Sequence, residues 1–157
     1  MKVERIDHVH IKVNDLKRNT SAIEGLLGEK FLYEGDFTSD FGMHISYNPF
    51  PLGFELMKVS DENKEMGRIY SAEPDGVFAL SLKVPNIDKA TVEMESMGLK
   101  LLMRYDFGDI KEALFDTKRV CSVYIELIEY ATEDITEADH GDVGSAGSIE
   151  FKKKIEK

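Results

Sequence analysis

Two glutamates stand where a protein chain rarely places a charge. Glu55 lies within residues 53–57, whose other members are Gly, Phe, Leu and Met, and Glu126 lies within residues 124–128, whose other members are Tyr, Ile and Leu. Burying a carboxylate without bonding partners is costly. A metal ion or a polar ligand would supply such partners. The alternative is a strand carboxylate that only hydrogen bonds from the protein satisfy.

A second group of polar side chains lies near the N-terminus. Residues 5–13 alternate between apolar and polar types, which predicts a strand that is buried on one face. The other face carries His8, His10 and Lys12. Because helices cover one face of such a sheet, the remaining face must be solvated, paired with a partner or wrapped into a cavity.

The two groups belong to an internal repeat. An offset of 71 residues places Lys12 on Lys83 and Glu55 on Glu126, and it places His8 on Ala79. Further matches at an offset of 70 include Gly28 with Gly98, and their order along the chain is the same in both halves. A repeat of this length predicts two copies of one structural unit.

Each copy is predicted to be a strand, a helix and three strands. The helices are expected at residues 16–27 and 87–97, and Gly28 and Gly98 stand where left-handed helix ends favour glycine. The predicted strands are 5–13, 30–37, 42–48 and 52–59 in the first copy, and 77–84, 100–107, 111–117 and 120–130 in the second. The predicted boundaries are 1–59 for the first module, 60–75 for a polar linker, 76–130 for the second module and 131–157 for a polar C-terminal tail.

The repeat and its motifs resemble the vicinal oxygen chelate superfamily, which includes glyoxalase I, methylmalonyl-CoA epimerase, extradiol dioxygenases and bleomycin-resistance proteins. The resemblance covers roughly residues 4–130, and its motifs are Ile6-Asp7-His8-Val9-His10-Ile11-Lys12-Val13, Gly53-Phe54-Glu55-Leu56, Ala79-Leu80-Ser81-Leu82-Lys83-Val84 and Ile125-Glu126-Leu127. It implies an α+β fold in which two βαβββ modules form a cupped mixed sheet around one cavity. We also expect the two modules to close on each other within one chain or across a homodimer.

The resemblance also implies a metal site. Metal-dependent members hold a divalent ion with residues of the first and last strands of each module, and His8, Glu55 and Glu126 match three of the four ligand positions. Ala79 occupies the third position and has no donor atom. His10 either compensates for it or lines the substrate pocket, and the sequence favours the pocket role. A ligand set of His and Glu suits Zn²⁺, Ni²⁺, Co²⁺, Mn²⁺ or Fe²⁺.

Two functions follow from this resemblance. The first is a lyase or isomerase of the glyoxalase or methylmalonyl-CoA epimerase type, in which Glu55 or Glu126 removes a proton next to a carbonyl of a small substrate. The second is a metal-free protein that binds a small molecule, as bleomycin-resistance relatives do. In either case Tyr47, Tyr105 and Tyr124 are candidate pocket walls beside His10.

Composition narrows the possible partners. The 157 residues include 30 acidic and 20 basic side chains, which gives a formal net charge of −10. Such a charge repels nucleic acids and anionic membrane surfaces. The sequence contains no apolar run long enough for a membrane span, and charged residues follow the first methionine. We therefore expect a cytoplasmic protein whose partner is a small-molecule substrate.

Overall fold

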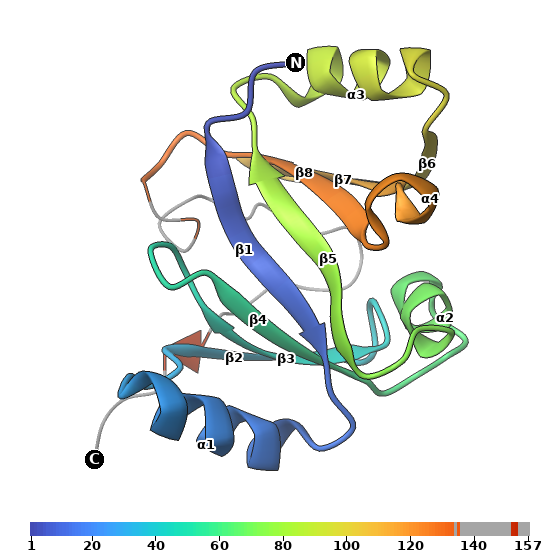
Figure 1. Cartoon of the computed structure of the whole chain (residues 1–157). Helices are drawn as coiled ribbons and strands as arrows, with labels where there is room; N and C mark the ends of the chain where they lie inside the picture. Colours follow the sequence, from blue (N-terminus) through green and yellow to red (C-terminus); the bar gives the residue numbers. More distant parts are fainter. Residues whose placement is uncertain (134, 136–151, 154–157) are drawn as a thin grey trace.

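A single mixed sheet organises the chain. The computed structural model describes residues 1–133, 135 and 152–153 (Figure 1). The strands are β1 (Arg5–Lys12), β2 (Tyr33–Phe37), β3 (Met43–Asn48), β4 (Phe54–Val59), β5 (Gly76–Lys83), β6 (Lys100–Phe107), β7 (Ile110–Asp116), β8 (Tyr124–Glu129) and β9 (Lys152–Lys153). The helices are α1 (Leu16–Leu27), α2 (Glu65–Ser71), α3 (Ile87–Ser96) and α4 (Lys118–Cys121). The predicted α+β fold with two βαβββ modules is confirmed.

The two modules join through their first strands. The sheet order is β6-β7-β8-β5-β1-β4-β3-β2-β9, and the central pair β1–β5 is antiparallel. Within each module the last strand returns beside the first one, so that β4 runs parallel to β1 and β8 runs parallel to β5. Figure 1 shows β6–β8 above the central pair and β2–β4 below it, with α3 and α1 outside them. The first and last strands of both modules are therefore neighbours at the centre of the sheet.

Local sequence signals explain the two long helices. The side chain of Asp15 accepts a hydrogen bond of 3.0 Å from the backbone N–H of Arg18 and caps α1, and Asn86 caps α3 in the same way at Lys89. Helix α1 ends at Gly28, which has a φ of 73° and donates its backbone N–H to Glu24. The predicted starts and ends of these helices are therefore confirmed to within a residue.

Each helix buries an apolar face against its own module. Leu16 of α1 packs with Leu56 of β4, while Ile87 and Met94 of α3 pack with Leu127 of β8. Leu56, Ile87 and Leu127 are completely buried. Burial on this scale stabilises a folded chain by about 1.5–3 kcal/mol for each large apolar side chain. These contacts fix the face of β4 and of β8 that points away from the helices.

The predicted second module differs at one connection. Residues 120–130 were expected to form one strand, but residues 118–121 form the short helix α4, and β8 begins only at Tyr124. Ser122 ends α4 in the left-handed conformation at a φ of 66°. Cys121 is consequently exposed.

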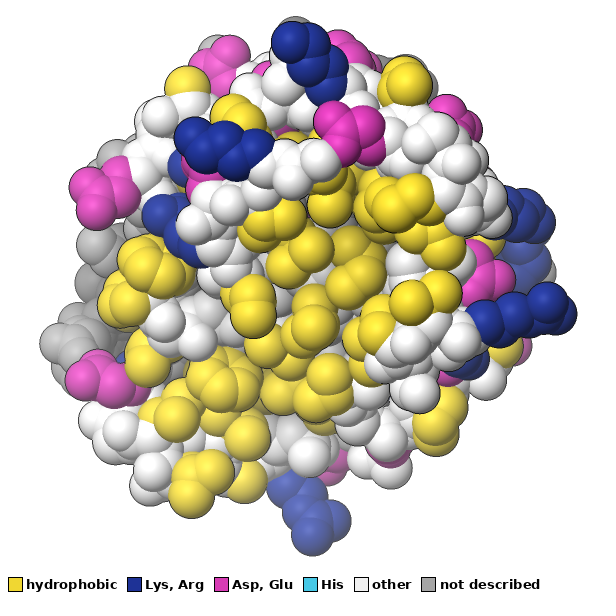
Figure 2. Space-filling model, turned by 45° about the horizontal axis from the view of Figure 1, so that its top comes forward, with side chains coloured by type: hydrophobic (Ala, Val, Ile, Leu, Met, Phe, Trp, Pro, Cys, Tyr) yellow, Lys and Arg dark blue, Asp and Glu magenta, His cyan; other side chains and the backbone are white. Residues whose placement is uncertain are grey.

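Part of the outer surface is apolar. Figure 2 shows hydrophobic side chains gathered over one face of the molecule. Ile6 on β1 and Val77 on β5 are among the exposed apolar residues, at 56 % and 54 % of their full accessible areas.

In the described part of the chain, no helix combines the length and the apolar character that crossing a bilayer requires. Of the predicted tail, residues 152–153 pair with β2, and most of the remainder lies outside the described residues.

Candidate functional site

The modules form a cavity on the face of the sheet that turns away from α1 and α3. Its volume is about 90 Å³. The lining residues come from both modules, from α2 and from the segment that follows β8: His8, His10, Phe37, Phe41, Met43, Ile45, Tyr47, Glu55, Met57, Met66, Tyr70, Ile110, Glu112, Glu126 and Ile135. Most of them are apolar, and five carry a carboxylate or an imidazole. These five side chains are the candidates for chemistry.

Strand alternation brings the two predicted glutamates into this cavity. Leu56 and Leu127 pack under the helices, so their neighbours Glu55 and Glu126 point to the opposite face and line the cavity. Both carboxylates therefore line one cavity.

A close backbone approach sets the position of β4. Gly53 precedes β4 with a φ of 60°, and a Cβ atom built there would lie 2.5 Å from the carbonyl oxygen of Asp7. The carbonyl oxygen of Gly53 accepts a hydrogen bond of 2.8 Å from the backbone N–H of Val9. Only glycine combines this conformation with such close contact. Gly53 therefore allows β4 to carry Glu55 up to His8.

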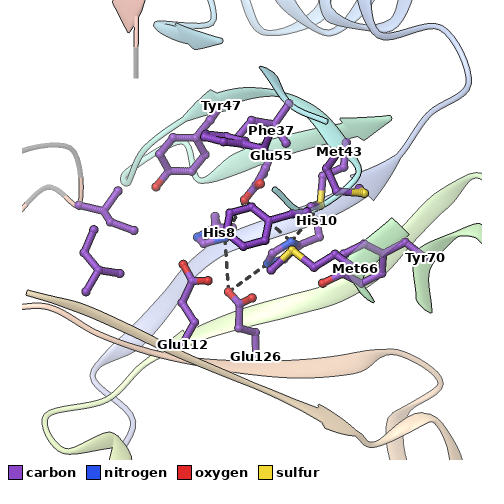
Figure 3. A pocket seen from close by; sticks show the side chains of 15 residues that line it. His8, His10, Phe37, Met43, Tyr47, Glu55, Met66, Tyr70, Glu112 and Glu126 are labelled. Carbon is purple, nitrogen blue, oxygen red and sulfur yellow. Dashed lines mark hydrogen bonds and ion pairs between the residues drawn. The ribbon is translucent and has the colours of Figure 1, made fainter. Parts of the chain in front are cut away.

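The imidazoles and carboxylates converge at the centre of the cavity (Figure 3). His8 Nε2 lies 3.1 Å from Glu55 Oε2 and 3.7 Å from Glu126 Oε1. His10 Nε2 lies 3.3 Å from the same Glu126 oxygen, and the centres of the two imidazole rings are 4.5 Å apart. His8, His10 and Glu126 are each at most 4 % exposed. The residues predicted as ligands and the one assigned to the pocket thus form a single cluster.

A buried hydrogen-bond network binds the Nδ1 atom of His8. Its Nδ1 lies 3.0 Å from Asp7 Oδ1, and Asp7 also accepts hydrogen bonds from Arg5 and from the hydroxyl of Tyr130. Burial opposes charge on Asp7, but these partners outweigh it and lower the pKa of Asp7 below its usual value. An ionised carboxylate only accepts hydrogen bonds, so Nδ1 of His8 carries a hydrogen. Nε2 is then the atom that His8 presents to the cavity.

The acidic neighbours also shift the titration of His8. Burial alone would lower the pKa of this imidazole, but the hydrogen bonds to Asp7 and Glu55 and the charges of Glu55 and Glu126 raise it well above the usual value. For Glu126, burial opposes the charge, and the nearby imidazoles of His10 and His8 outweigh it and lower the pKa. The cluster therefore favours a positive charge between its carboxylates.

Glu112 is a cavity residue that the sequence analysis did not identify. It lies on β7, half-buried among the lining residues, and Figure 3 shows it close to Glu126. Burial and the charges of Glu126 and Glu55 raise the pKa of Glu112 well above its usual value. Its neighbours on the same strand face are Ile110 and Leu114, both buried. The signal that identified Glu55, a carboxylate at an apolar position, was therefore also present here.

Of the three tyrosines predicted to line the pocket, one lies in the cavity wall and two do not. Tyr47 lines the cavity, whereas Tyr105 and Tyr124 are not among the lining residues. The hydroxyl of Tyr105 donates to Glu65 at 2.8 Å, and that of Tyr124 donates to Glu73 at 2.7 Å. Glu65 and Glu73 belong to the chain segment that connects β4 to β5. Their hydrogen bonds hold both hydroxyl groups away from the cluster of imidazoles and carboxylates.

The donor set fits a divalent metal ion. One donor atom each of His8, His10 and Glu126 can be chosen so that all three lie within 4.8 Å of one another. Within the described residues, His10 Nε2 and Glu126 Oε1 are buried and make no hydrogen bond, although they are 3.3 Å apart. Buried polar atoms are seldom left without partners. Imidazole nitrogen and carboxylate oxygen are ligands of Zn²⁺, Mn²⁺, Fe²⁺, Co²⁺ and Ni²⁺. Ala79 is completely buried beside them and offers no donor.

Comparison with known proteins identifies solved structures that share this fold. No protein-family model and no curated protein matches the sequence. Among solved structures, methylmalonyl-CoA epimerase from Mycobacterium tuberculosis is similar with 24 % identity and a TM-score of 0.65, over 83 % of this chain and 90 % of that one.

Two further solved structures are similar to this chain. A variant of Streptomyces coelicolor methylmalonyl-CoA epimerase in complex with 2-nitronate-propionyl-CoA has 18 % identity and a TM-score of 0.66, over 83 % of this chain and 100 % of that one. A hypothetical protein from Bacillus halodurans C-125 has 19 % identity and a TM-score of 0.68, over 82 % of this chain and 96 % of that one. The chain therefore shares the fold of these methylmalonyl-CoA epimerase structures, which is the fold that the resemblance implied.

Proposed function

We propose that this protein is a metal-assisted isomerase that moves a proton on the carbon atom next to a carbonyl group of a small acyl substrate. The observation that carries this proposal is the convergence of two imidazoles and two carboxylates, mostly buried, in one cavity that is otherwise largely apolar. The epimerase structures that share its fold support the same class of reaction.

His8, His10 and Glu126 would hold the ion. When bound, a divalent cation polarises a carbonyl oxygen and stabilises the negative charge that develops on it. The chain itself supplies three further properties: Asp7 fixes the Nδ1–H tautomer of His8, apolar walls exclude water, and Glu55 offers a carboxylate beside the cluster. Exclusion of water strengthens the electrostatic interactions inside the cavity.

Glu55 and Glu112 are the proton carriers in this proposal. The carboxylate of Glu55 takes the proton from the α-carbon, and the electron pair of the broken C–H bond moves into the carbonyl group to give an enolate. Return of a proton to the α-carbon regenerates the carbonyl. Glu112 comes from the other module, and its raised pKa favours the protonated form that can donate this proton.

Hydrogen exchange in heavy water tests the reaction on two classes of substrate. Methylmalonyl-CoA, which is bound in one of the similar structures, represents the acyl thioesters. A glutathione hemithioacetal represents the glyoxalase substrates. Each would be incubated in D₂O with Co²⁺-loaded protein, and deuterium at the α-carbon would be measured by mass spectrometry against a protein-free control. We expect exchange with one of the two that is lost in Glu55→Gln.

Metal-free binding is the competing outcome. If neither compound exchanges its proton and the cavity binds a small aromatic molecule equally well with and without EDTA, the protein is a metal-free binding protein. In that case Glu55→Gln would leave the affinity for the aromatic molecule nearly unchanged.

A further inference from the structure

Position 79, where an alanine replaces a ligand, has a histidine directly opposite it on the neighbouring strand. The repeat places Ala79 where the first module has His8, so the second module lacks the matching imidazole. In the antiparallel pair β1–β5, however, Ala79 lies directly opposite His10, and His8 lies opposite Ser81. Of the two histidines on β1, His10 is therefore the one that faces the vacated position.

Cross-strand pairing puts the His10 side chain over Ala79. Residues directly opposite each other on antiparallel strands project to the same face, with Cβ atoms about 4.5–5.5 Å apart. The methyl group of Ala79 leaves room on this face, and a large side chain there would compete with the imidazole. His10 Nε2 is accordingly 3.3 Å from Glu126 Oε1, on the strand that borders β5 on its other side.

The hydrogen-bond partners of His10 orient its free nitrogen. Its Nδ1 lies 3.2 Å from the sulfur of Met57, and a thioether can only accept a hydrogen bond, so Nδ1 is the donor. Nε2 then faces Glu126 Oε1, and neither buried atom has a hydrogen-bond partner among the described residues. The Nε2 atoms of His8 and His10 thus both point to one carboxylate oxygen. A metal ion placed between these three atoms would bond to all of them.

We propose that His10 has taken over the ligand role that position 79 lost, so that both imidazole ligands of the metal site come from β1. The ion would be held by His8 and His10 from one strand and by Glu126 from the other module, with Glu55 beside it. This proposal rests on the metal ion that the proposed function requires, but metal binding can be measured without a substrate.

A ligand swap between the two strands tests this proposal. Zn²⁺ affinity would be measured by competition with a chromophoric chelator for four proteins: the natural chain, His10→Ala, Ala79→His and the double variant His10→Ala/Ala79→His. We expect His10→Ala to lose on the order of 100-fold in affinity, at least as much as loss of an outer-shell partner costs. The double variant should recover to within about tenfold of the natural chain.

Two controls separate ligation from folding. His44→Ala removes an imidazole on β3 that pairs with Glu34 outside the cavity, and it should leave the affinity unchanged. His10→Leu keeps the bulk of the side chain and should lose the metal as His10→Ala does. Pulsed EPR of the Cu²⁺-loaded proteins counts coordinated imidazoles directly: two are expected in the natural chain, one in His10→Leu and two in the double variant.

The results that overturn the assignment are distinct from those that overturn the proposed function. If folded His10→Leu binds Zn²⁺ as tightly as the natural chain, or if Cu²⁺ still coordinates two imidazoles in it, His10 is not a ligand. A double variant that folds but does not recover affinity contradicts the exchange of roles between positions 10 and 79. Metal binding that follows the expected pattern without any proton exchange would leave the ligand assignment intact and refute the isomerase.

Discussion

Replacing Asp7 by asparagine should weaken both the fold and the metal site. The two carboxylate oxygens of Asp7 accept hydrogen bonds from His8 Nδ1 at 3.0 Å, from Arg5 Nε at 3.3 Å and from the hydroxyl of Tyr130. Asparagine keeps one acceptor oxygen and puts an NH₂ group in place of the other. If the oxygen faces His8, the NH₂ group meets the donors of Arg5 and Tyr130.

The expected magnitude follows from these contacts. A hydrogen bond to a charged group contributes about 1.5–3 kcal/mol, and breaking a buried ion pair costs about 3–5 kcal/mol. The side chain of Asp7 is completely buried while that of Arg5 is 21 % exposed, so solvent weakens part of the network. We therefore expect Asp7→Asn to lower the free energy of unfolding by about 3 kcal/mol. For a chain of this size, that corresponds to a decrease in Tm of roughly 10 °C.

Calorimetry and metal titration on the same samples check this prediction. Asp75→Asn, which changes an exposed aspartate in the linker, is the matched control and should leave Tm nearly unchanged. Asp7→Asn should also weaken Zn²⁺ binding by about 10–100-fold, because the Nδ1–H tautomer of His8 is no longer fixed by a charged acceptor. A variant with unchanged Tm and unchanged Zn²⁺ affinity would refute the role we assign to Asp7.

Three further predictions test other parts of the structure. Gly53→Ala should lower both Tm and Zn²⁺ affinity, because a methyl group there meets the carbonyl oxygen of Asp7 at 2.5 Å in a conformation with φ of 60°; equal Zn²⁺ affinity would contradict it. Leu56→Ala should cost about 2–5 kcal/mol in urea unfolding, since Leu56 is completely buried, whereas Leu26→Ala at an 80 % exposed position should cost little. In metal-free protein, Glu112→Gln should raise stability at pH 7 but not at pH 4: the folded state raises the pKa of Glu112, so its contribution to stability is lost as pH rises above the ordinary glutamate pKa. A Tm difference independent of pH would speak against it.

Much of the fold could be predicted because its determinants are local or periodic. Asp15 marks the start of α1 by accepting a hydrogen bond with its side chain, and Gly28 marks the end by donating its backbone N–H to Glu24. Strand alternation is equally local, and it places Glu55 and Glu126 on one face once their apolar neighbours are buried. The repeat then requires both glutamates to meet at the junction of the modules.

The remaining features depend on contacts between distant segments. The pairing of His10 with Ala79 follows from the register of β1 against β5, which contains two irregularities that no sequence pattern indicates. Tyr124 has the strand position of a pocket residue, but Glu73 in the linker binds its hydroxyl. The sequence could therefore name candidate side chains, while register and linker contacts decided which of them reach the cavity.

The parallel pairings β1–β4 and β5–β8 have a consequence for folding kinetics. In each module the last strand must close a loop over the whole module before it reaches the first strand, and such non-local pairings form slowly. The donor atoms of His8, His10 and Glu126 meet only after both closures and after β1 has paired with β5. An ion that binds this assembled cluster stabilises the native state without stabilising earlier species. Zn²⁺ should therefore slow unfolding of the chain while leaving its refolding rate almost unchanged.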